Sequence, residues 1–227
     1  MDLARINGVI EAAGLTPLGA FHPKPDDAAP ALADGQHART LVLAGNAGPA
    51  MWRAFSTARE PARDLLDDWS RDVLAPLARD LGAHAIYPFE QPYPPFQRWA
   101  MKAGPCHPSP LGMFIHPDHG LWFGFRGALA FAEEISLPAP DQRPAPCEDC
   151  PDKPCLGACP VGAFSEEHGY DVPKCIDHIA GPDSRDCLSQ GCHARRACPI
   201  GADARYSPEQ AAFHMRAFLR NNAGLKT

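Results

Sequence analysis

Residues 147–164 read CEDCPDKPCLGACPVGAF and residues 187–202 read CLSQGCHARRACPIGA, with Cys175 between them. The stretch from Cys147 to Cys198 holds eight of the nine cysteines of the 227-residue chain. The first run has the spacing C-x2-C-x4-C-x3-C-P, and the second, from Cys187, has C-x4-C-x5-C-P. Since four thiolates hold one four-iron cubane, the eight cysteines predict two 4Fe-4S clusters.

The proline after each last cysteine predicts how the ligands divide. In bacterial ferredoxins with two clusters, the cysteine before the proline ligates the cluster of the other run. A cubane has irons at tetrahedral corners, so three ligands come from one tight loop and the fourth from elsewhere. The longer gaps here leave the pairing of individual cysteines open. The rule favours the sets Cys147, Cys150, Cys155, Cys198 and Cys159, Cys175, Cys187, Cys192.

Other uses of the cysteines remain as alternatives. Four thiolates also suit a tetrahedral structural zinc site, although zinc needs no proline after the last cysteine. Disulfides are disfavoured because the chain opens MDLARINGVIEAAGL, without the features of a secretory signal, so a reducing cytoplasm is expected. Cys106 lies outside the module and is expected to be a buried or partly exposed thiol.

Composition limits the classes of partner. The net charge is −6 and the sequence pI is about 5.9, so we expect no global basic surface, and a nucleic-acid partner is unlikely. The local cluster His193–Arg196 is expected to offset the negative charge of cysteine-ligated iron or to meet an acidic partner. No apolar run approaches the length of a membrane span, which predicts a soluble cytoplasmic protein without a membrane partner.

Hydrophobic periodicity predicts alternating helices and strands in the first 138 residues, and therefore a mixed α/β sandwich. We expect helices at 2–14, 49–55, 67–81 and 96–102, strands at 40–46 and 83–89, and a hairpin with arms 111–116 and 121–126. Ser207, Pro208 and Gln210 predict the start of a last helix. The predicted domains are an α/β domain at 1–138, a proline-rich linker at 139–146, a double-cluster domain at 147–206 and a C-terminal helix at 207–227.

Residues 109–138, SPLGMFIHPDHGLWFGFRGALAFAEEISLP, resemble a stretch of two families. One is the methylmalonic aciduria and homocystinuria type C proteins, which process cobalamin and carry I-H-P-x-x-G-x-W-x-x-x-R-G; the other is epoxyqueuosine reductase. Two further stretches are similar to the first family, AGNAGPAMWRAF from residue 44 and RYSPEQAAF from residue 205. The second family is similar in RWAMKAG, from residue 98, and in the cysteine arrangement. The resemblance implies an α+β protein: a flavin-reductase or nitroreductase-like α/β sandwich that binds cobalamin base-off, followed by a bacterial ferredoxin-like double-cluster domain.

The resemblance also implies site residues. Arg126 would bind a carboxamide, carboxylate or thiol anion through its planar guanidinium. Glu90 lies near the position of the proton-donating aspartate of epoxyqueuosine reductase, although its neighbours QPYPPF do not match and a solvated glutamate is the alternative. His116 could be an axial cobalt ligand, but a structural histidine beside a turn is favoured. The residues that match the corrinoid-pocket motif are His116, Pro117, Gly120, Trp122, Arg126 and Gly127.

The favoured function is a redox enzyme that passes low-potential electrons through two clusters to cobalamin, for corrinoid reduction, upper-ligand removal or reductive chemistry. Flavodoxin, ferredoxin or a reductase would supply the electrons, and a corrinoid or small molecule would be the substrate. The alternatives are a non-catalytic ferredoxin-type electron carrier and a zinc-stabilised interaction protein. Epoxyqueuosine reductase activity on tRNA is less favoured because only about twenty residues follow Tyr206, where that family continues into helical repeats that help hold tRNA.

Overall fold

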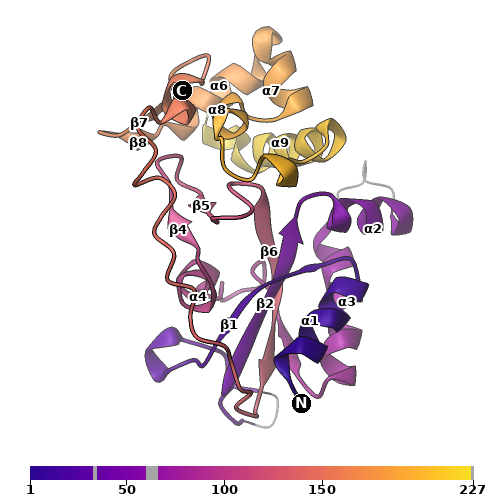
Figure 1. The fold of residues 1–227 in the computed structure, drawn as a ribbon. Helices are drawn as coiled ribbons and strands as arrows, with labels where there is room; N and C mark the ends of the chain where they lie inside the picture. The colour runs from indigo at the N-terminus through magenta and orange to yellow at the C-terminus, as the bar shows by residue number, and fades with distance from the viewer. Residues whose placement is uncertain (33–34, 60–65, 226–227) are drawn as a thin grey trace. The chain divides into compact units, whose positions relative to one another are not determined.

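The computed structural model describes residues 1–32, 35–59 and 66–225 and divides the chain into two compact units (Figure 1). Unit 1 comprises residues 1–105 and 123–143, and unit 2 comprises residues 106–122 and 144–227. The change from one unit to the other at 143/144 falls inside the predicted linker. The segment 106–122 differs from the predicted division, because it packs with the cysteine region and not with the α/β domain that surrounds it in the sequence.

Unit 1 is built on one four-stranded sheet of order β1-β2-β6-β3, in which all neighbouring strands are antiparallel. Helices α1 and α3 cover one face of the sheet, and α4 lies on the other (Figure 1). The described elements are α1 (Leu3–Ala12), β1 (Thr16–Phe21), η1 (Pro25–Asp27), β2 (Thr40–Ala47), α2 (Ala50–Ala58), α3 (Leu66–Asp80), β3 (His84–Ile86), α4 (Phe96–Ala103) and β6 (Phe123–Phe131). The mixed helix-and-sheet fold class is confirmed.

The central strands β2 and β6 carry the core of unit 1. Residues Leu41–Ala44 are buried on both faces of the sheet, as a continuous apolar run predicts, and they pair with residues 127–130 of β6. Strand β1 was not predicted from the sequence, because Pro17 and Gly19 interrupt its pattern. It lies at the edge of the sheet with a register irregularity between Pro17 and Ala20, which is where proline is tolerated in strands.

Helix α3 contains Pro76 and is continuous from Leu66 to Asp80. The sequence repeats apolar residues every four positions at Trp69, Val73, Leu77 and Leu81, and of these Trp69 and Leu81 are buried. Val73 and Leu77 are only half-buried, whereas the buried positions are Leu66, Trp69, Ser70, Leu74 and Ala78. A strict spacing of four drifts around a helix with 3.6 residues per turn, and spacings of three and four together keep a stripe on one face.

The predicted hairpin of 111–116 and 121–126 is also wrong. A single bridge between His116 and Gly120 closes the turn. Before it, β5 (Phe114–Ile115) pairs with β4 (His107–Pro108), and after it β6 joins the sheet of unit 1. Each arm therefore finds its strand partner elsewhere, and the turn marks the passage of the chain from unit 2 to unit 1.

Asp27 is a buried carboxylate that ties η1 to α4 in unit 1. Its Oδ2 accepts from the Lys24 N–H at 2.8 Å, its Oδ1 is paired with Lys102, and its carbonyl accepts from the Trp99 indole at 2.8 Å. Burial alone would raise the pKa of Asp27, but these hydrogen bonds and the charges of Lys102 and Arg98 lower it overall. The ionised form is thus stabilised by the fold.

We expect Asp27→Asn to lower the free energy of unfolding at pH 7 by about 1–3 kcal/mol, because the hydrogen-bonding partners of the buried carboxylate lose their charged acceptor. The pKa of Asp27 in the folded protein lies below the unfolded value of about 3.9. The carboxylate therefore stabilises the fold in full at any pH above the unfolded pKa, and this stabilisation is lost as the pH falls through the folded pKa. Urea unfolding from pH 7 to pH 2.5 should show the variant and the wild type converging in acid. The control is Asp26→Asn on the exposed neighbour, and a constant difference at every pH would contradict the assignment.

Unit 2 is built from short elements around the cysteines. Two small apolar clusters form its core, one around Leu111, Ile115 and Phe164 and one around Ile176 and Ile179, and cysteines belong to both. Besides β4 and β5, the described elements are α5 (Pro154–Gly157), β7 (Phe164–Ser165), β8 (Gly169–Tyr170), α6 (Val172–Ala180), η3 (Pro182–Ser184), α7 (Arg185–Gln190), α8 (His193–Ala197), η4 (Ala202–Ala204), α9 (Pro208–Asn222) and η5 (Ala223–Leu225).

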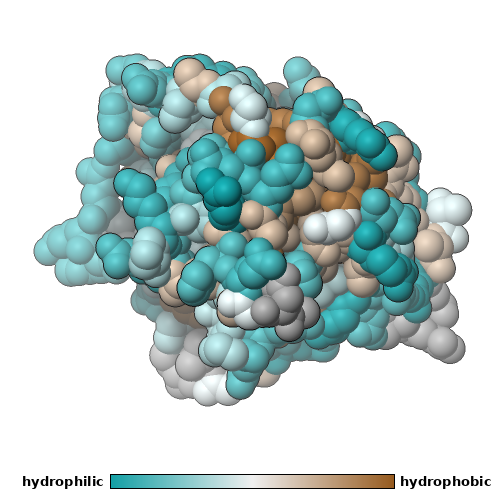
Figure 2. Space-filling model, turned by 90° about the horizontal axis from the view of Figure 1, so that it is seen from below, coloured by the Kyte–Doolittle hydropathy of each residue, from teal (hydrophilic) through white to brown (hydrophobic). Residues whose placement is uncertain are grey.

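Polar side chains cover most of the face shown in Figure 2, where apolar residues gather in one recessed area. Among the described residues, no helix combines the length and the apolar character that crossing a membrane requires. At the start of α9, Ser207 accepts from the Gln210 N–H at 3.2 Å, which is the predicted cap. Among the described residues, the buried Gln210 side chain has no hydrogen-bond partner, so it does not bond back to Ser207 as its position in the first turn would allow.

Candidate functional site: two sets of cysteine thiols

The eight cysteines of residues 147–198 fall into two sets of four within unit 2. A thiolate changes the pKa of another thiol only when the two sulfurs are close. Burial raises the pKa of Cys147, and the thiols of Cys198, Cys155 and Cys150 raise it further. The Cys150 thiol likewise raises the pKa of Cys155 and that of Cys198. We call Cys147, Cys150, Cys155 and Cys198 the first set.

The other four thiols interact in the same way. Burial raises the pKa of Cys187 to about 11, with further contributions from Cys192, Cys175 and Cys159. These four thiols also line one small cavity, together with Pro160, Phe164 and Met215. We call Cys159, Cys175, Cys187 and Cys192 the second set. The two sets are those that the ferredoxin rule favours, and metal ligation itself stays a prediction.

Backbone N–H groups point at the sulfurs of both sets. Short helices and turns place them, because the first N–H groups of a helix have no partner within it. In the first set, the N–H groups of Cys155 and Leu156 favour the thiolate of Cys155 and the Ile200 N–H favours that of Cys198, although burial raises the pKa of both. In the second set, the Ala163 N–H donates to Cys159 at 3.3 Å. The N–H groups of Ala194 and Arg195 near the start of α8 favour the thiolate of Cys192, against burial, which raises its pKa.

Two side chains add hydrogen bonds to the second set. The hydroxyl of Tyr170, at the end of β8, donates to the Cys175 sulfur. His178 lies one turn after Cys175 on α6, and its Nε2 is 3.6 Å from the Cys187 sulfur. Neither residue was singled out from the sequence. The spacing of three residues between Cys175 and His178 is the signal that could have placed the imidazole beside the site.

The donor set fits iron–sulfur clusters. Each set supplies four thiols, and N–H and O–H donors to ligand sulfurs are among the features that tune such clusters. In the described part of the chain, no group of three or more His, Cys, Asp or Glu side chains is arranged around a single metal ion. Cys106 lies apart in the 106–122 segment, where burial raises its pKa to about 12 and keeps it a neutral thiol.

Arg195 joins the 106–122 segment to the cysteine region inside unit 2. Its Nε and Nη2 donate to the Leu121 carbonyl at 2.9 and 2.5 Å. Its guanidinium packs against two adjoining rings, 4.4 Å from the centre of Trp122 and 4.5 Å from that of Tyr206. The next basic residues, His193 and Arg196, are paired with Asp186. The predicted basic cluster is thus engaged mainly in local contacts.

Four of the predicted corrinoid-pocket residues lie in unit 2, where they have structural contacts. The Nδ1 of His116 accepts from the N–H groups of Asp118 and His119 at 3.1 and 3.3 Å, which is the favoured structural reading of this histidine. Pro117 lies in the turn between the paired residues His116 and Gly120. Trp122 packs on Arg195, as described above.

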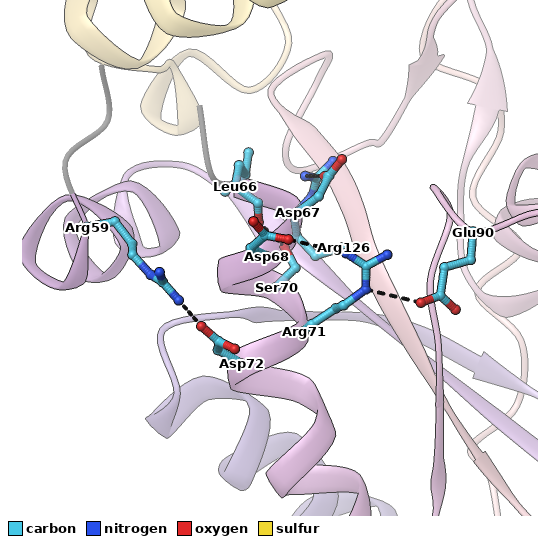
Figure 3. A network of polar contacts seen from close by, with 9 residues as sticks. All are labelled: Arg59, Leu66, Asp67, Asp68, Ser70, Arg71, Asp72, Glu90 and Arg126. Atoms are coloured by element: carbon cyan, nitrogen blue, oxygen red, sulfur yellow. Dashed lines mark hydrogen bonds and ion pairs between the residues drawn. The ribbon is translucent and has the colours of Figure 1, made fainter. Parts of the chain in front are cut away.

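Arg126 and Gly127 belong to β6 of unit 1. The Arg126 Nη1 is 3.3 Å from Asp67 on α3, and its Nε donates to the Phe125 carbonyl at 2.8 Å (Figure 3). Gly127 lies against α3, where a Cβ would collide with Leu74. The six predicted pocket residues are therefore divided between the two units. The 550 Å³ cavity of unit 1 is lined by none of them, and a 370 Å³ cavity of unit 2 by Trp122 alone.

Glu90, the predicted proton donor, is half-exposed and accepts a hydrogen bond from the Arg71 Nε at 3.1 Å. Arg71 also reaches Asp68 on its own helix, so Glu90 belongs to a surface network of ion pairs around α3 (Figure 3). This contact is the one expected of an ordinary solvated glutamate. A role for Glu90 in proton transfer stays a prediction.

Comparison with known proteins supports the fold. No family model and no curated protein matches the sequence. A crystal structure of epoxyqueuosine reductase with a tRNA-Tyr stem loop modified with epoxyqueuosine is similar, with a TM-score of 0.51 and 14% identity. The match covers 92% of this chain and 69% of that chain. The resemblance to epoxyqueuosine reductase is thus supported at the level of fold, whereas the comparisons give no support to the cobalamin-processing family.

The same comparison corrects the expectation that a nucleic-acid partner is unlikely. The similar protein was solved with a tRNA stem loop, so this fold is compatible with binding nucleic acid. The expectation failed because a net charge of −6 is a sum over the whole chain. Local basic surfaces decide phosphate contacts, and an overall acidic balance does not exclude them.

Proposed function

We propose that the chain is an iron–sulfur oxidoreductase whose unit 2 holds two 4Fe-4S clusters. The first set of Cys147, Cys150, Cys155 and Cys198 would hold one cluster, and the second set of Cys159, Cys175, Cys187 and Cys192 the other. When bound, such clusters supply transfer of single electrons at low potential. The protein's own part is to fix the sulfurs, to donate hydrogen bonds to them and to limit access of water.

One observation carries this proposal: the eight thiols gather as two groups of four, with hydrogen-bond donors aimed at sulfurs of both. Cysteines that serve only packing would not need polar groups at their sulfurs. In the second set, the Ala163 N–H donates to Cys159, the Tyr170 hydroxyl donates to Cys175, and the His178 Nε2 lies 3.6 Å from the Cys187 sulfur. Hydrogen bonds to ligand sulfurs offset the negative charge that an iron–sulfur site gains on reduction.

A role for cobalamin is the finer part of the proposal, and it has less support. The residues that the motif assigns to a corrinoid pocket lie in two units and have structural contacts within each. The resemblance of residues 109–138 is what favours cobalamin. The similarity of fold favours a second candidate substrate, a modified nucleoside in tRNA such as epoxyqueuosine. A ferredoxin-type electron carrier remains the alternative without catalysis.

The decisive experiment is anaerobic purification with analysis of iron, zinc and acid-labile sulfide. We expect about eight irons and eight sulfides per chain, because each cubane contains four of each. Zinc without sulfide would overturn the proposal. Titration with hydroxocobalamin, followed by its absorption spectrum, then tests the corrinoid role. Incubation with an epoxyqueuosine-modified stem loop and a low-potential reductant tests the tRNA substrate, and clusters with neither response leave the electron carrier.

Tyr170→Phe is expected to lower the reduction potential of the cluster bound by the second set. The hydroxyl donates to Cys175, and its hydrogen bond stabilises the more negative, reduced state. A hydrogen bond is worth about 0.5–1.5 kcal/mol, which corresponds to at most about 20–65 mV for one electron. Redox titration followed by electron paramagnetic resonance measures the shift. Tyr206→Phe, which removes a hydroxyl from a ring packed on Arg195, is the control and should leave both potentials unchanged.

A further inference from the structure

A larger cavity lies beside the small one that the second set lines. It has a volume of about 370 Å³ and is contained within unit 2. Cys175, Cys192, Phe164 and Met215 line both cavities, so the two share a wall that includes two thiols of the second set. We call the larger one the aromatic cavity. Neither the cysteine pattern nor the proposed electron transfer assigns a role to it.

Rings of similar orientation form one side of the aromatic cavity. Phe164 and Tyr170 are stacked with their centres 4.4 Å apart and their planes at 18°. Tyr170 and Phe218 follow at 6.3 Å and 21°. Small residues at Gly112, Gly191 and Ala211 complete the lining and leave the space open. Near-parallel rings offer their faces or edges to another flat ring.

A cation also lines the aromatic cavity. Arg195 is held in place by the Leu121 carbonyl and by the rings of Trp122 and Tyr206, so its charge is positioned before any ligand arrives. A guanidinium favours carbonyl or anionic oxygens. The lining is otherwise dominated by apolar side chains, which disfavours a strongly hydrated ligand such as a free sugar phosphate.

Tyr170 connects the cavity to the second set. Its ring is part of the lining, and its hydroxyl donates to Cys175. We propose that the aromatic cavity binds a planar aromatic molecule that carries carbonyl oxygens, the chemistry shared by quinones and isoalloxazines. The ring would stack in line with Phe164, Tyr170 and Phe218, with a carbonyl directed toward Arg195. A cavity of this volume lies within the range of small-molecule sites, at about 300–1,000 Å³.

Isothermal titration calorimetry of the full-length, anaerobically purified protein tests the proposal, with menadione and riboflavin as separate probes. Met113→Trp places a large ring in the cavity, and Met101→Trp is the matched control at an exposed site of unit 1. We expect at least one probe to bind wild type and Met101→Trp with one-to-one stoichiometry, and Met113→Trp at least tenfold more weakly. Phe218→Leu, which removes one ring of the stack, should bind several-fold more weakly.

Which probe binds identifies the source of the ring, as a quinone or an isoalloxazine. Absence of binding by both probes to the wild type would overturn the proposal, as would unchanged affinity in both Met113→Trp and Phe218→Leu. Unchanged denaturant unfolding of the variants shows that unit 2 is folded. Calorimetry reports binding whether or not the protein carries clusters, so failure of the proposed function and failure of this site are separate results.

Discussion

Replacing Cys159 and Cys192 together by alanine is expected to leave about half of the iron, whereas replacing Cys155 and Cys159 together is expected to remove nearly all of it. Both proteins lose two thiols, so they differ only in how the two are distributed. Cys159 and Cys192 belong to the second set, and their loss spares the first. Cys155 belongs to the first set, so the second pair takes one ligand from each cluster.

The experiment distinguishes the crossed sets from a sequential division. If each cluster took four consecutive cysteines, Cys155 and Cys159 would share a cluster and Cys159 and Cys192 would not. The variant without Cys155 and Cys159 would then keep about half of the iron, and the variant without Cys159 and Cys192 would lose nearly all of it. Losing one of its four thiolates leaves one iron of a cubane without a protein ligand, so we expect a single substitution per set to remove most of the iron of that set.

Iron and sulfide per chain, measured after anaerobic purification, decide the outcome. The matched control is Cys106→Ala, which removes a buried thiol of unit 2 that belongs to neither set. It lies apart from both sets, so its loss removes no thiol that the proposal assigns to iron. Full iron content in Cys106→Ala, with the two double variants differing as stated, supports the crossed sets.

From the sequence, spacing and the two Cys-Pro pairs single out the eight cysteines and favour the two sets. The sequence left the pairing of individual cysteines open, because the fourth thiol of each set comes from a distant part of the chain. The groups that donate hydrogen bonds to the sulfurs were harder to predict from the sequence. Tyr170 reaches Cys175 only because β8 turns back into α6, and composition gives no sign of that turn. A hydrogen bond between neighbouring elements depends on their geometry, which a spacing rule does not contain.

The fold of unit 1 was predictable where apolar residues are dense, as in β2. It was not predictable where pairing is non-local. The turn at Pro117–Gly120 carries the signals of a hairpin, but pairing energy with β2 and β3 draws β6 into the larger sheet. Before the turn, β5 pairs with β4, and directly after it Arg195 bonds to the Leu121 carbonyl and packs on Trp122. Local turn chemistry was therefore overridden by contacts far away in the sequence.

Two glycines in corresponding turns allow a matched test of how unit 2 holds the first set. Gly162 follows Cys159-Pro160 and Gly201 follows Cys198-Pro199, and both have positive φ, +58° and +71°. At Gly162 an added Cβ would meet nothing closer than Lys174 at 4.0 Å. At Gly201 it would collide with the backbone of His119 and Gly120. The two positions share backbone strain but differ in available space.

Gly162→Ala is expected to lower the free energy of unfolding by about 1–2 kcal/mol, the cost of a left-handed conformation for a residue with a Cβ. Gly201→Ala should lower it by about 2–5 kcal/mol, because forced separation of two backbones adds about 1–3 kcal/mol to that strain. The 106–122 segment would also be pushed from the loop that follows Cys198, so we expect loss of iron from the first set. Denaturant unfolding and iron analysis of both variants measure these effects. Equal destabilisation with full iron in both would show that the contact between Gly120 and Gly201 does not hold the first set in place.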